Sequence, residues 1–593
     1  MSIKARIKIT KDYYKKNGIA KTLKKVKYKS VNFIKNRKKH KINAENYKLW
    51  IEKNEPNEAE LEQQRNHSFE YEPKISVVVP MYNTKELFLK DIVDSMLKQT
   101  YKNWELCLAD GSPKKLEYYD KYINKSDKIK YKFLNENKGI SGNTNRAIEM
   151  ATGEYIALLD HDDLLPAFSL YEIVKTINSN RDAEFLYTDE DKIYDGKRID
   201  PHFKPDYAPD TLMSYNYICH FAIYKKELLE RTGLLNSEFD GSQDYDIILR
   251  ACENAKKIVH IPKILYNWRM NEDSVALNSS AKPYAYVAAK KAIKAHLDRI
   301  GEEAEVVDSD IVGIYNVNYK IKGNPKVSII ISNIDDVSKL DGCIKSICKK
   351  TNYKNFEIII VNNKDNDETS EESSIQYNGI DIKRVYSNED CSSVATLKNL
   401  GVKNSDGEYI IFIDSHIKII SSNWIETLLG NCQRKDVGVV GAKILLNNSL
   451  LEHVGIILDN DNVVSYVSRG VDACESGYMA RNNIIQNYNA VSGKLLIISR
   501  NSYEEAGLLD ESLSDEYANI DLCFKLRASG KVNVLNPLVV VNDRIRHNDK
   551  DKEKEKQDKL KIKIKWSSMY GEYDSYYNPN FRTDIPDMSI KAD

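Results

Sequence analysis

The sequence predicts an α/β protein, because strands and helices alternate along its first half and the same order returns in its second half. The first strand is an apolar, β-branched run over 75–79, which is typical of a strand buried in a parallel sheet. A helix over about 85–98, a strand over 104–109, a helix over 142–150 and a strand over 155–159 follow. This alternation predicts a doubly wound, Rossmann-like sheet.

The repeat is carried by three pairs of segments in the same order. PKISVVV at Pro73 matches PKVSIII at Pro325, YKNWEL at Tyr101 matches YKNFEI at Tyr353, and GEYIALLD later matches GEYIIFID. A repeat of this length indicates a duplicated domain. We therefore expect a basic helical arm over 1–70, a first domain over 71–322, a second over 323–550, and a charged helix and tail over 551–593.

The composition is that of a folded protein. At 593 residues the chain is too long for one core, and its 41% hydrophobic and 30% charged residues exclude a largely disordered chain. Lys+Arg and Asp+Glu both number 88, so the net charge is zero and gives no argument for nucleic-acid binding.

The amino-terminal arm is strongly basic, with Asp12 as the one acid in residues 1–40. Apolar residues recur at helical spacing over 19–33 with lysines between them, which fits either a helix on an anionic membrane surface or a solvated tail. A further helix over 44–64 is expected to pack against the first domain.

The sequence favours a cytoplasmic location, in solution or peripherally on the inner face of the membrane. Apolar runs stay well short of the roughly 18 residues of a transmembrane helix, and the amino terminus lacks the apolar stretch of a signal peptide. Nine cysteines, an odd number without a CxxC pair, indicate free thiols in a reducing compartment.

Acidic groups follow the strands of the predicted sheet, where α/β proteins bind ligands. Asp110 ends the second strand and could contact a nucleoside or cap a turn. The cluster over 160–163 carries three carboxylates that suit Mg²⁺ or Mn²⁺, although Asp162 or Asp163 could instead cap a helix. Asp244 and Asp246 lie at a predicted helix start, and spacing does not decide which is a general base and which a cap.

Together these groups resemble the family 2 glycosyltransferases with the GT-A fold. The resemblance covers about 75–274, where ISVVVPMYN corresponds to the first-strand motif and HIPKILYNWR to the end of the domain. Asp160-His161-Asp162 corresponds to the family's DxD motif, and Gln243-Asp244 to its late acidic motif. Glu usually precedes the base in this family, so Gln243 departs from the pattern while Asp244 retains it.

The resemblance implies a metal-dependent inverting transfer, with Asp244 as base, Asp160 and Asp162 as ligands of Mn²⁺ or Mg²⁺, and a UDP- or dTDP-linked sugar as donor. The acceptor would be a glycan or lipid-linked molecule, as in the similar two-domain, rhamnosyltransferase-like enzymes of bacterial surface polysaccharides. Expected donor contacts are Pro80, Tyr82, Asn83, Asp110, Asp160 and Arg269. Expected acceptor-side residues are His220, Asp189, Glu190, Asp191 and Trp268. Arg269 fits a surface ion pair equally well, and a lone histidine is more often structural.

The second domain lacks the same groups. In the alignment of the repeats Asp110 falls on Asn362, Asp162 on His416, and Asp244 on Asn519. Because asparagine cannot take a proton from a hydroxyl, we expect this domain to be degenerate. Substitute bases remain open, namely Asp515, Glu516 and Asp521.

Other functions also remain open. A bifunctional transferase would use both domains, and a glycan-binding or scaffold protein would use neither for catalysis. A nucleotidyltransferase shares the fold class but would carry a Gly-rich, basic loop after its first strand, where this chain has MYNTKE.

Overall fold

A computed structural model describes residues 42–270, 283–333, 337–362, 373–377, 380–387, 393–446, 449–459, 462–544, 552–569, 571 and 573–592. The predicted membrane-binding stretch over 19–33 lies outside these residues. The chain forms two compact units, 1–57 with 589–593, and 58–588. Across the described residues, none of the helices has the length and apolarity to cross a bilayer.

The predicted helix over 44–64 is two helices. One spans 42–54 in the first unit, and α2 (Glu58–Asn66) begins the second unit. The break contains Pro56, whose ring lacks an N–H and clashes with the preceding turn. On α2, Leu61 packs against the hydrophobic core of the first sheet.

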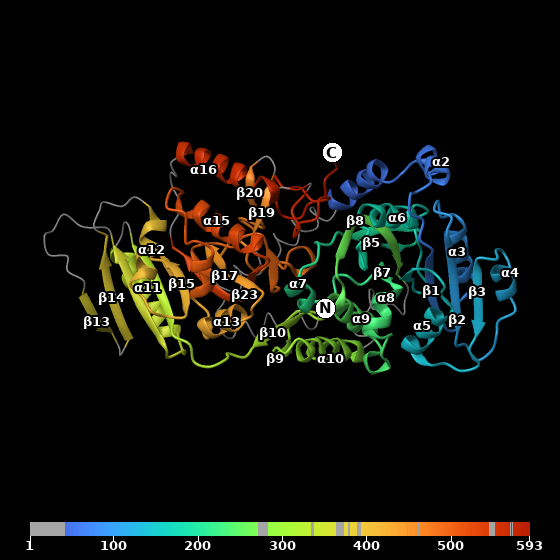
Figure 1. The fold of residues 1–593 in the computed structure, drawn as a ribbon, viewed down its shortest axis with the longest axis horizontal. Coiled ribbons are helices and arrows are strands. Elements are labelled where there is room, and N and C mark those ends of the chain that lie inside the picture. The colour runs from blue at the N-terminus through green and yellow to red at the C-terminus, as the bar shows by residue number, and fades with distance from the viewer. Residues whose placement is uncertain are drawn as a thin grey trace, which may run out of the picture. The chain divides into compact units, whose positions relative to one another are not determined.

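The first sheet has eight strands in the order β3-β2-β1-β4-β7-β5-β6, with β8 beside β5 (Figure 1). The first four are parallel, and β7 runs antiparallel to both β4 and β5. The bounds are β1 (Ile75–Met81), β2 (Trp104–Asp110), β3 (Ile129–Phe133), β4 (Tyr155–Leu158), β5 (Phe185–Tyr194), β6 (Lys197–His202), β7 (Ala222–Lys225) and β8 (Ile258–Arg269). A mixed, mainly parallel α/β sheet is therefore confirmed.

Helices cover this sheet, and α5 packs on β1 and β2. The predicted strands and helices agree with the structure to within a few residues. The helix bounds are α3 (Glu86–Leu97), α4 (Tyr119–Ile123), α5 (Gly139–Met150), α6 (Ser169–Ser179), α7 (Pro209–Ser214), α8 (Lys226–Thr232), α9 (Gln243–Asn254) and α10 (Pro283–Arg299). The hairpin of β9 (Ala304–Asp308) and β10 (Tyr315–Tyr319) follows.

The second sheet repeats the order of the first. Its path β14-β12-β11-β15-β22-β17-β23 has the same sequence of neighbours as β3-β2-β1-β4-β7-β5-β8. The second sheet packs on a hydrophobic core of its own. Its strands are β11 (Val327–Asn333), β12 (Phe356–Asn362), β13 (Ser373–Tyr377), β14 (Ile380–Tyr386), β15 (Tyr409–Asp414), β16 (Ile417–Ile419), β17 (Val437–Leu446), β18 (Leu451–His453), β21 (Gln486–Tyr488), β22 (Leu495–Ser499) and β23 (Val532–Asp543). A separate ribbon pairs β19 (Ile456–Asp459) with β20 (Val463–Tyr466).

Equivalent hydrogen bonds recur in the two sheets. Ser76 Oγ donates to Glu105 at 2.7 Å, and Ser328 Oγ donates to Glu357 at 2.6 Å. The Tyr101 hydroxyl donates to the Pro73 carbonyl at 2.7 Å, as Tyr353 does to Pro325 at 2.6 Å. We call residues 71–322 the first half and residues 323–550 the second half.

The second half and the carboxyl-terminal region contribute further helices. They are α11 (Val337–Lys350), α12 (Val394–Lys403), α13 (Trp424–Cys432), α14 (Arg500–Glu505), α15 (Asp515–Ala528) and α16 (Lys552–Lys565). The charged run after the second half forms α16, as predicted, although Ile562 on it is buried. Residues 573–588, which we call the C-terminal strap, are irregular and bury Tyr576, Tyr577 and Phe581.

Candidate active site

A cavity of about 1030 Å³ lies at the carboxyl ends of β1 and β4. This is the edge of an α/β sheet at which ligands bind. The predicted site residues that line it are Pro80, Tyr82, Asn83, Asp160, Asp162, Glu190, His220, Asp244 and Trp268. The predicted residues outside its described lining are Asp110, Asp189, Asp191 and Arg269.

The turn after β4 gathers carboxylates at the cavity. Asp160, Asp163 and His220 each offer one ligand atom, and these three atoms lie within 4.8 Å of one another. Burial raises the pKa of Asp163 well above its ordinary value, and the neighbouring Asp162 and Asp160 carboxylates raise it further. A cation at this turn would relieve that repulsion.

This set of groups fits Mn²⁺ or Mg²⁺, because two carboxylates and an imidazole are acceptable ligands of Mn²⁺ and carboxylates suit both ions. Asp163 is the weaker ligand, since its two oxygens already accept from the Tyr266 hydroxyl at 2.5 Å and the Arg269 N–H at 2.7 Å. The predicted metal ligands are Asp160 and Asp162, whereas the cluster joins Asp160 to Asp163 and to His220, which was expected on the acceptor side.

Arg269 braces the acidic turn. Its Nε donates to the Asp162 carbonyl at 2.8 Å, and its guanidinium pairs with Asp91 at 2.8 Å. The guanidinium thus holds the turn in place and forms the ion pair that was the alternative, while its predicted donor contact stays a prediction.

The structure distinguishes the two aspartates at the start of α9. Asp244 lines the cavity, and its Oδ2 accepts a hydrogen bond from Asn216 Nδ2 at 2.8 Å. Asp246 is buried and pairs with Arg250 one turn along the helix at 2.7 Å. Burial raises the pKa of Asp244 above its ordinary value, although the nearby His220 opposes that rise. A carboxylate with a raised pKa facing a cavity suits a general base.

Asp110 is buried at the end of β2. Its carboxylate accepts from the Tyr131 hydroxyl at 2.8 Å and from the Ser112 hydroxyl at 2.5 Å. Ser112 Oγ in turn accepts the N–H of Asn83, which lines the cavity, at 2.8 Å. Asp110 therefore positions Asn83 indirectly, and its predicted contact with a nucleoside stays a prediction.

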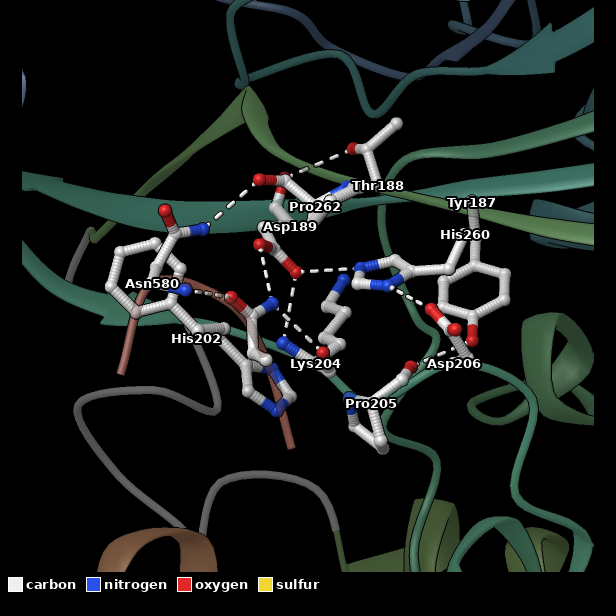
Figure 2. Close-up of polar contacts among 12 residues, drawn as sticks. Tyr187, Thr188, Asp189, His202, Lys204, Pro205, Asp206, His260, Pro262 and Asn580 are labelled. Atoms are coloured by element: carbon white, nitrogen blue, oxygen red, sulfur yellow. Dashed lines mark hydrogen bonds and ion pairs between the residues drawn. The ribbon is translucent and has the colours of Figure 1, made fainter. Parts of the chain in front are cut away.

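The three acids of β5 point to opposite faces of the strand, since successive side chains alternate. Glu190 faces the cavity beside His202 at 3.3 Å and Lys204 at 3.2 Å. Burial alone would raise the pKa of Glu190, but Lys204, His202 and His220 lower it to about 2. On the other face Asp191 pairs with Arg198 at 2.5 Å. Asp189 pairs with His260 at 2.9 Å (Figure 2).

Aromatic side chains form the wall near His220. The His220 ring stacks on Tyr266 with 4.7 Å between centroids and meets the edge of Trp268 at 5.8 Å. Cavity residues that the sequence analysis missed include Asn216, Cys219, His202, Tyr215 and Met479. None of them belongs to a motif of the sequence: His202 ends β6, and Tyr215 and Asn216 directly follow α7.

Sequence comparison identifies the family. A sequence model described as glycosyl transferase family 2 matches residues 76–233 and again residues 328–454. An uncharacterized glycosyltransferase of Methanocaldococcus jannaschii is 30% identical over 228 residues, which are 37% of this chain and 79% of the relative. The chain belongs to glycosyl transferase family 2.

Two longer relatives match more of this family 2 chain. The uncharacterized protein y4gI of Sinorhizobium fredii is 37% identical over 474 residues, which are 78% of this chain and 52% of the relative. The O-antigen biosynthesis protein RfbC of Myxococcus xanthus is 27% identical over 556 residues, 92% of this chain and 43% of the relative. The chain thus spans about half the length of these two relatives.

In the second family 2 match, a lysine on α12 pairs with the acid that ends β15. Lys398 Nζ is 2.7 Å from Asp515 and 3.5 Å from Asp414, which ends β15 as Asp160 follows β4. Burial alone would lower the pKa of Lys398, but the two carboxylates outweigh it and hold that pKa above its ordinary value. An ammonium group is therefore the counterion of these acids.

The position of the base also differs in the second half. Asp521 pairs with Lys525 at 3.0 Å, as Asp246 does with Arg250, which aligns Asn519 with Asp244. Asn519 is buried and donates to the Val491 carbonyl at 2.7 Å. An amide in this setting cannot act as a general base.

Proposed function

We propose that the first half is an inverting, metal-dependent glycosyltransferase that moves a sugar from a UDP- or dTDP-linked donor to a growing cell-surface glycan. The observation that carries this proposal is one cavity lined by Asp244, Asp160 and His220, of which Asp160 and His220 form a cluster of possible ligands with the buried Asp163. The O-antigen name of one relative supports a polysaccharide or lipid-linked acceptor.

Asp160, with Asp163 and His220, would hold the divalent ion, and Asp162 adjoins them on the cavity wall. When bound, the ion supplies positive charge against the diphosphate of the leaving group. Asn83 and Tyr82 line the same side of the cavity and are placed to contact the donor.

Asp244 is the proposed general base. Its Oδ accepts the proton of the acceptor hydroxyl while that oxygen bonds to the anomeric carbon from the face opposite the diphosphate. The bond from the anomeric carbon to the diphosphate oxygen breaks, and the nucleoside diphosphate leaves with the electron pair. Asn216 fixes the carboxylate through its 2.8 Å hydrogen bond.

We propose that the second half is a degenerate copy of the first. Its acids are neutralised by Lys398, and Asn519 takes the place of the base. A bifunctional transferase is the alternative. It would need a second donor site that functions although Lys398 already pairs with the acids. A non-catalytic glycan-binding protein would make no use of the acids that the first half retains.

The experiment is a screen of UDP- and dTDP-sugars for donor hydrolysis with Mn²⁺ or Mg²⁺. Equivalent positions of the two halves give a matched pair of variants, Asp162→Asn and His416→Asn. We expect metal-dependent hydrolysis of one donor, abolished by Asp162→Asn and retained by His416→Asn. Hydrolysis of a second donor that survives Asp162→Asn would establish two active sites and overturn the proposal.

For the location we propose the cytoplasmic face of the membrane, reached through the basic arm over 1–40. The motivation is the charge of that arm, which carries a single acid. The full chain should sediment with vesicles that contain anionic lipid, and a chain that lacks residues 1–40 should not. Equal sedimentation of the full and shortened chains would contradict this.

A further inference from the structure

The second half adds a side chain to the cavity of the first half. Met479, in a short turn that includes Tyr478 and Ala480, lines that cavity although more than two hundred residues separate it from Asp244. We propose that the second half completes the acceptor-binding side of the active site, with Met479 as an acceptor-contacting residue. This inference rests on the proposed function of the first half.

Tyr478 fixes Met479 to the wall formed by β5 and β6. Its hydroxyl donates to the Pro201 carbonyl at 2.6 Å and accepts the Phe203 N–H at 2.9 Å. The residue between these two partners is His202, which lines the cavity and contacts Glu190 at 3.3 Å. Met479 therefore lies on the His202 side, away from the donor-side residues of β1.

The second half also contacts α7, the helix that precedes Asn216, whose amide hydrogen-bonds to the proposed base Asp244. Arg434 makes a buried, two-pronged ion pair with Asp210 on α7, with distances of 2.5 and 3.0 Å. The Ser214 hydroxyl at the end of α7 donates to the Ile485 carbonyl at 2.7 Å. The next two residues, Tyr215 and Asn216, line the cavity. Contacts from the second half thus position the amide that binds Asp244.

The C-terminal strap reaches the same wall from the other face of β5. Asn578 Nδ2 donates to Asp189 at 2.9 Å and to the Lys204 carbonyl at 2.8 Å. Lys204 Nζ donates to the Ile218 and His220 carbonyls and pairs with Glu190. Figure 2 shows Lys204 beside Asp189, and Asn580 of the strap donating to the Pro262 carbonyl at 3.0 Å.

The strap is anchored on the second half as well. Asp574 accepts from the Leu458 N–H at 2.6 Å and from Asn489 at 2.7 Å, and Arg481 donates to the Tyr576 carbonyl at 3.0 Å. The acceptor wall is consequently held from beyond the first half by Tyr478, by Arg434 and Ile485, and by the C-terminal strap.

The ligand of this wall is a carbohydrate with an apolar C–H face. Trp268, Tyr215, Tyr284 and Tyr286 line the cavity, and such rings present flat apolar surfaces with polar edges. Met479 adds an adaptable thioether side chain to this surface.

The first experiment separates acceptor binding from donor binding. With the donor that the wild type uses, and p-nitrophenyl monoglycosides as acceptors, we compare wild type, Met479→Glu and Leu538→Glu, which adds the same charge at an exposed site of the second half. Met479→Glu should raise the acceptor KM at least ~10-fold by placing a charge against apolar ligand surface. The Kd of the nucleoside diphosphate with Mn²⁺, from calorimetry, should change less than about twofold.

Two results overturn the inference, namely an acceptor KM for Met479→Glu within about twofold of wild type, or an equal rise for Leu538→Glu. Failure of the proposed function would look different, because the wild type would then hydrolyse no donor.

The second experiment needs no acceptor. Tyr478→Phe removes a hydroxyl that pairs with the backbone on both sides of His202, so amide exchange at 202–203 should accelerate roughly 10-fold. Exchange in β2 should stay unchanged. Wild-type exchange rates at 202–203 in the variant would show that the second half does not hold this wall.

Discussion

Lys398 occupies in the second half the place that Thr144 occupies in the first. The following residues, Asn145 and Asn399, make the same contact, each donating through Nδ2 to a leucine carbonyl, at 2.8 and 3.1 Å. Thr144 lines the cavity of the first half, whereas Lys398 carries an ammonium to Asp414 and Asp515. This substitution thus supplies an internal cation to the acids of the second half, whereas we propose a bound divalent ion for those of the first.

Replacing that lysine should destabilise the second half. Lys398→Met leaves the buried Asp414 and the partly buried Asp515 without their lysine counterion, which should lower the free energy of unfolding by about 3 kcal/mol. Mn²⁺ should restore part of the loss, because the acids would regain a cation. Urea unfolding with and without Mn²⁺ measures both effects. Lys403→Met, an exposed lysine on the same helix, is the control, and equal loss in the two variants would contradict the assignment.

The ion pair between Asp210 and Arg434 should be a major contact between the halves. Asp210→Asn leaves Arg434 buried with less charge compensation, and we expect a loss of about 3–5 kcal/mol in unfolding free energy. Arg434 also pairs with the exposed Asp436 at 3.2 Å, so Asp436→Asn is a matched control that should cost about 1 kcal/mol or less. Similar costs for both variants, measured by urea denaturation, would contradict this account.

His260 should make stability depend on pH. Burial would lower its pKa, but Asp189 and Asp206 on its two sides raise it to about 9 (Figure 2). Because the folded pKa exceeds the unfolded value of about 6.5, the stabilisation is complete below about pH 6.5 and is lost as pH rises through about 9. The full contribution is about 3 kcal/mol.

The measurement for His260 is urea unfolding of wild type and His260→Gln between pH 6.5 and pH 9.5, conditions chosen as roughly spanning that window. The difference between the two proteins should shrink steadily across the range. His67→Gln, at an exposed histidine, is the control. A constant difference for His260→Gln would mean that the imidazole is neutral in the folded protein.

Local patterns made much of the first half predictable. The β-branched run of β1 and the helical start at Asp244 are read over a few residues, and the carboxyl ends of parallel strands meet at one edge. The same rules could have separated Glu190 from Asp189 and Asp191, because strand side chains alternate. Pro56 could likewise have predicted the break after residue 54.

Contacts between distant segments were not predictable in this way. Tyr478 bonds to Phe203 across 275 residues, and Asn578 bonds to Asp189 across 389 residues. Neither pair belongs to a repeat or a spacing pattern, so nothing local signals it. The role of Met479 in the cavity therefore emerges only from the fold.

The most direct test of the central claim compares Asp244→Asn with Asn519→Ala, the equivalent positions of the two halves, in the rate of sugar transfer. Asp244→Asn should lower kcat by about 10²–10⁴-fold while nucleoside diphosphate binding is retained, and Asn519→Ala should leave kcat unchanged. Wild-type turnover by Asp244→Asn would contradict a single active site in the first half with Asp244 as its base.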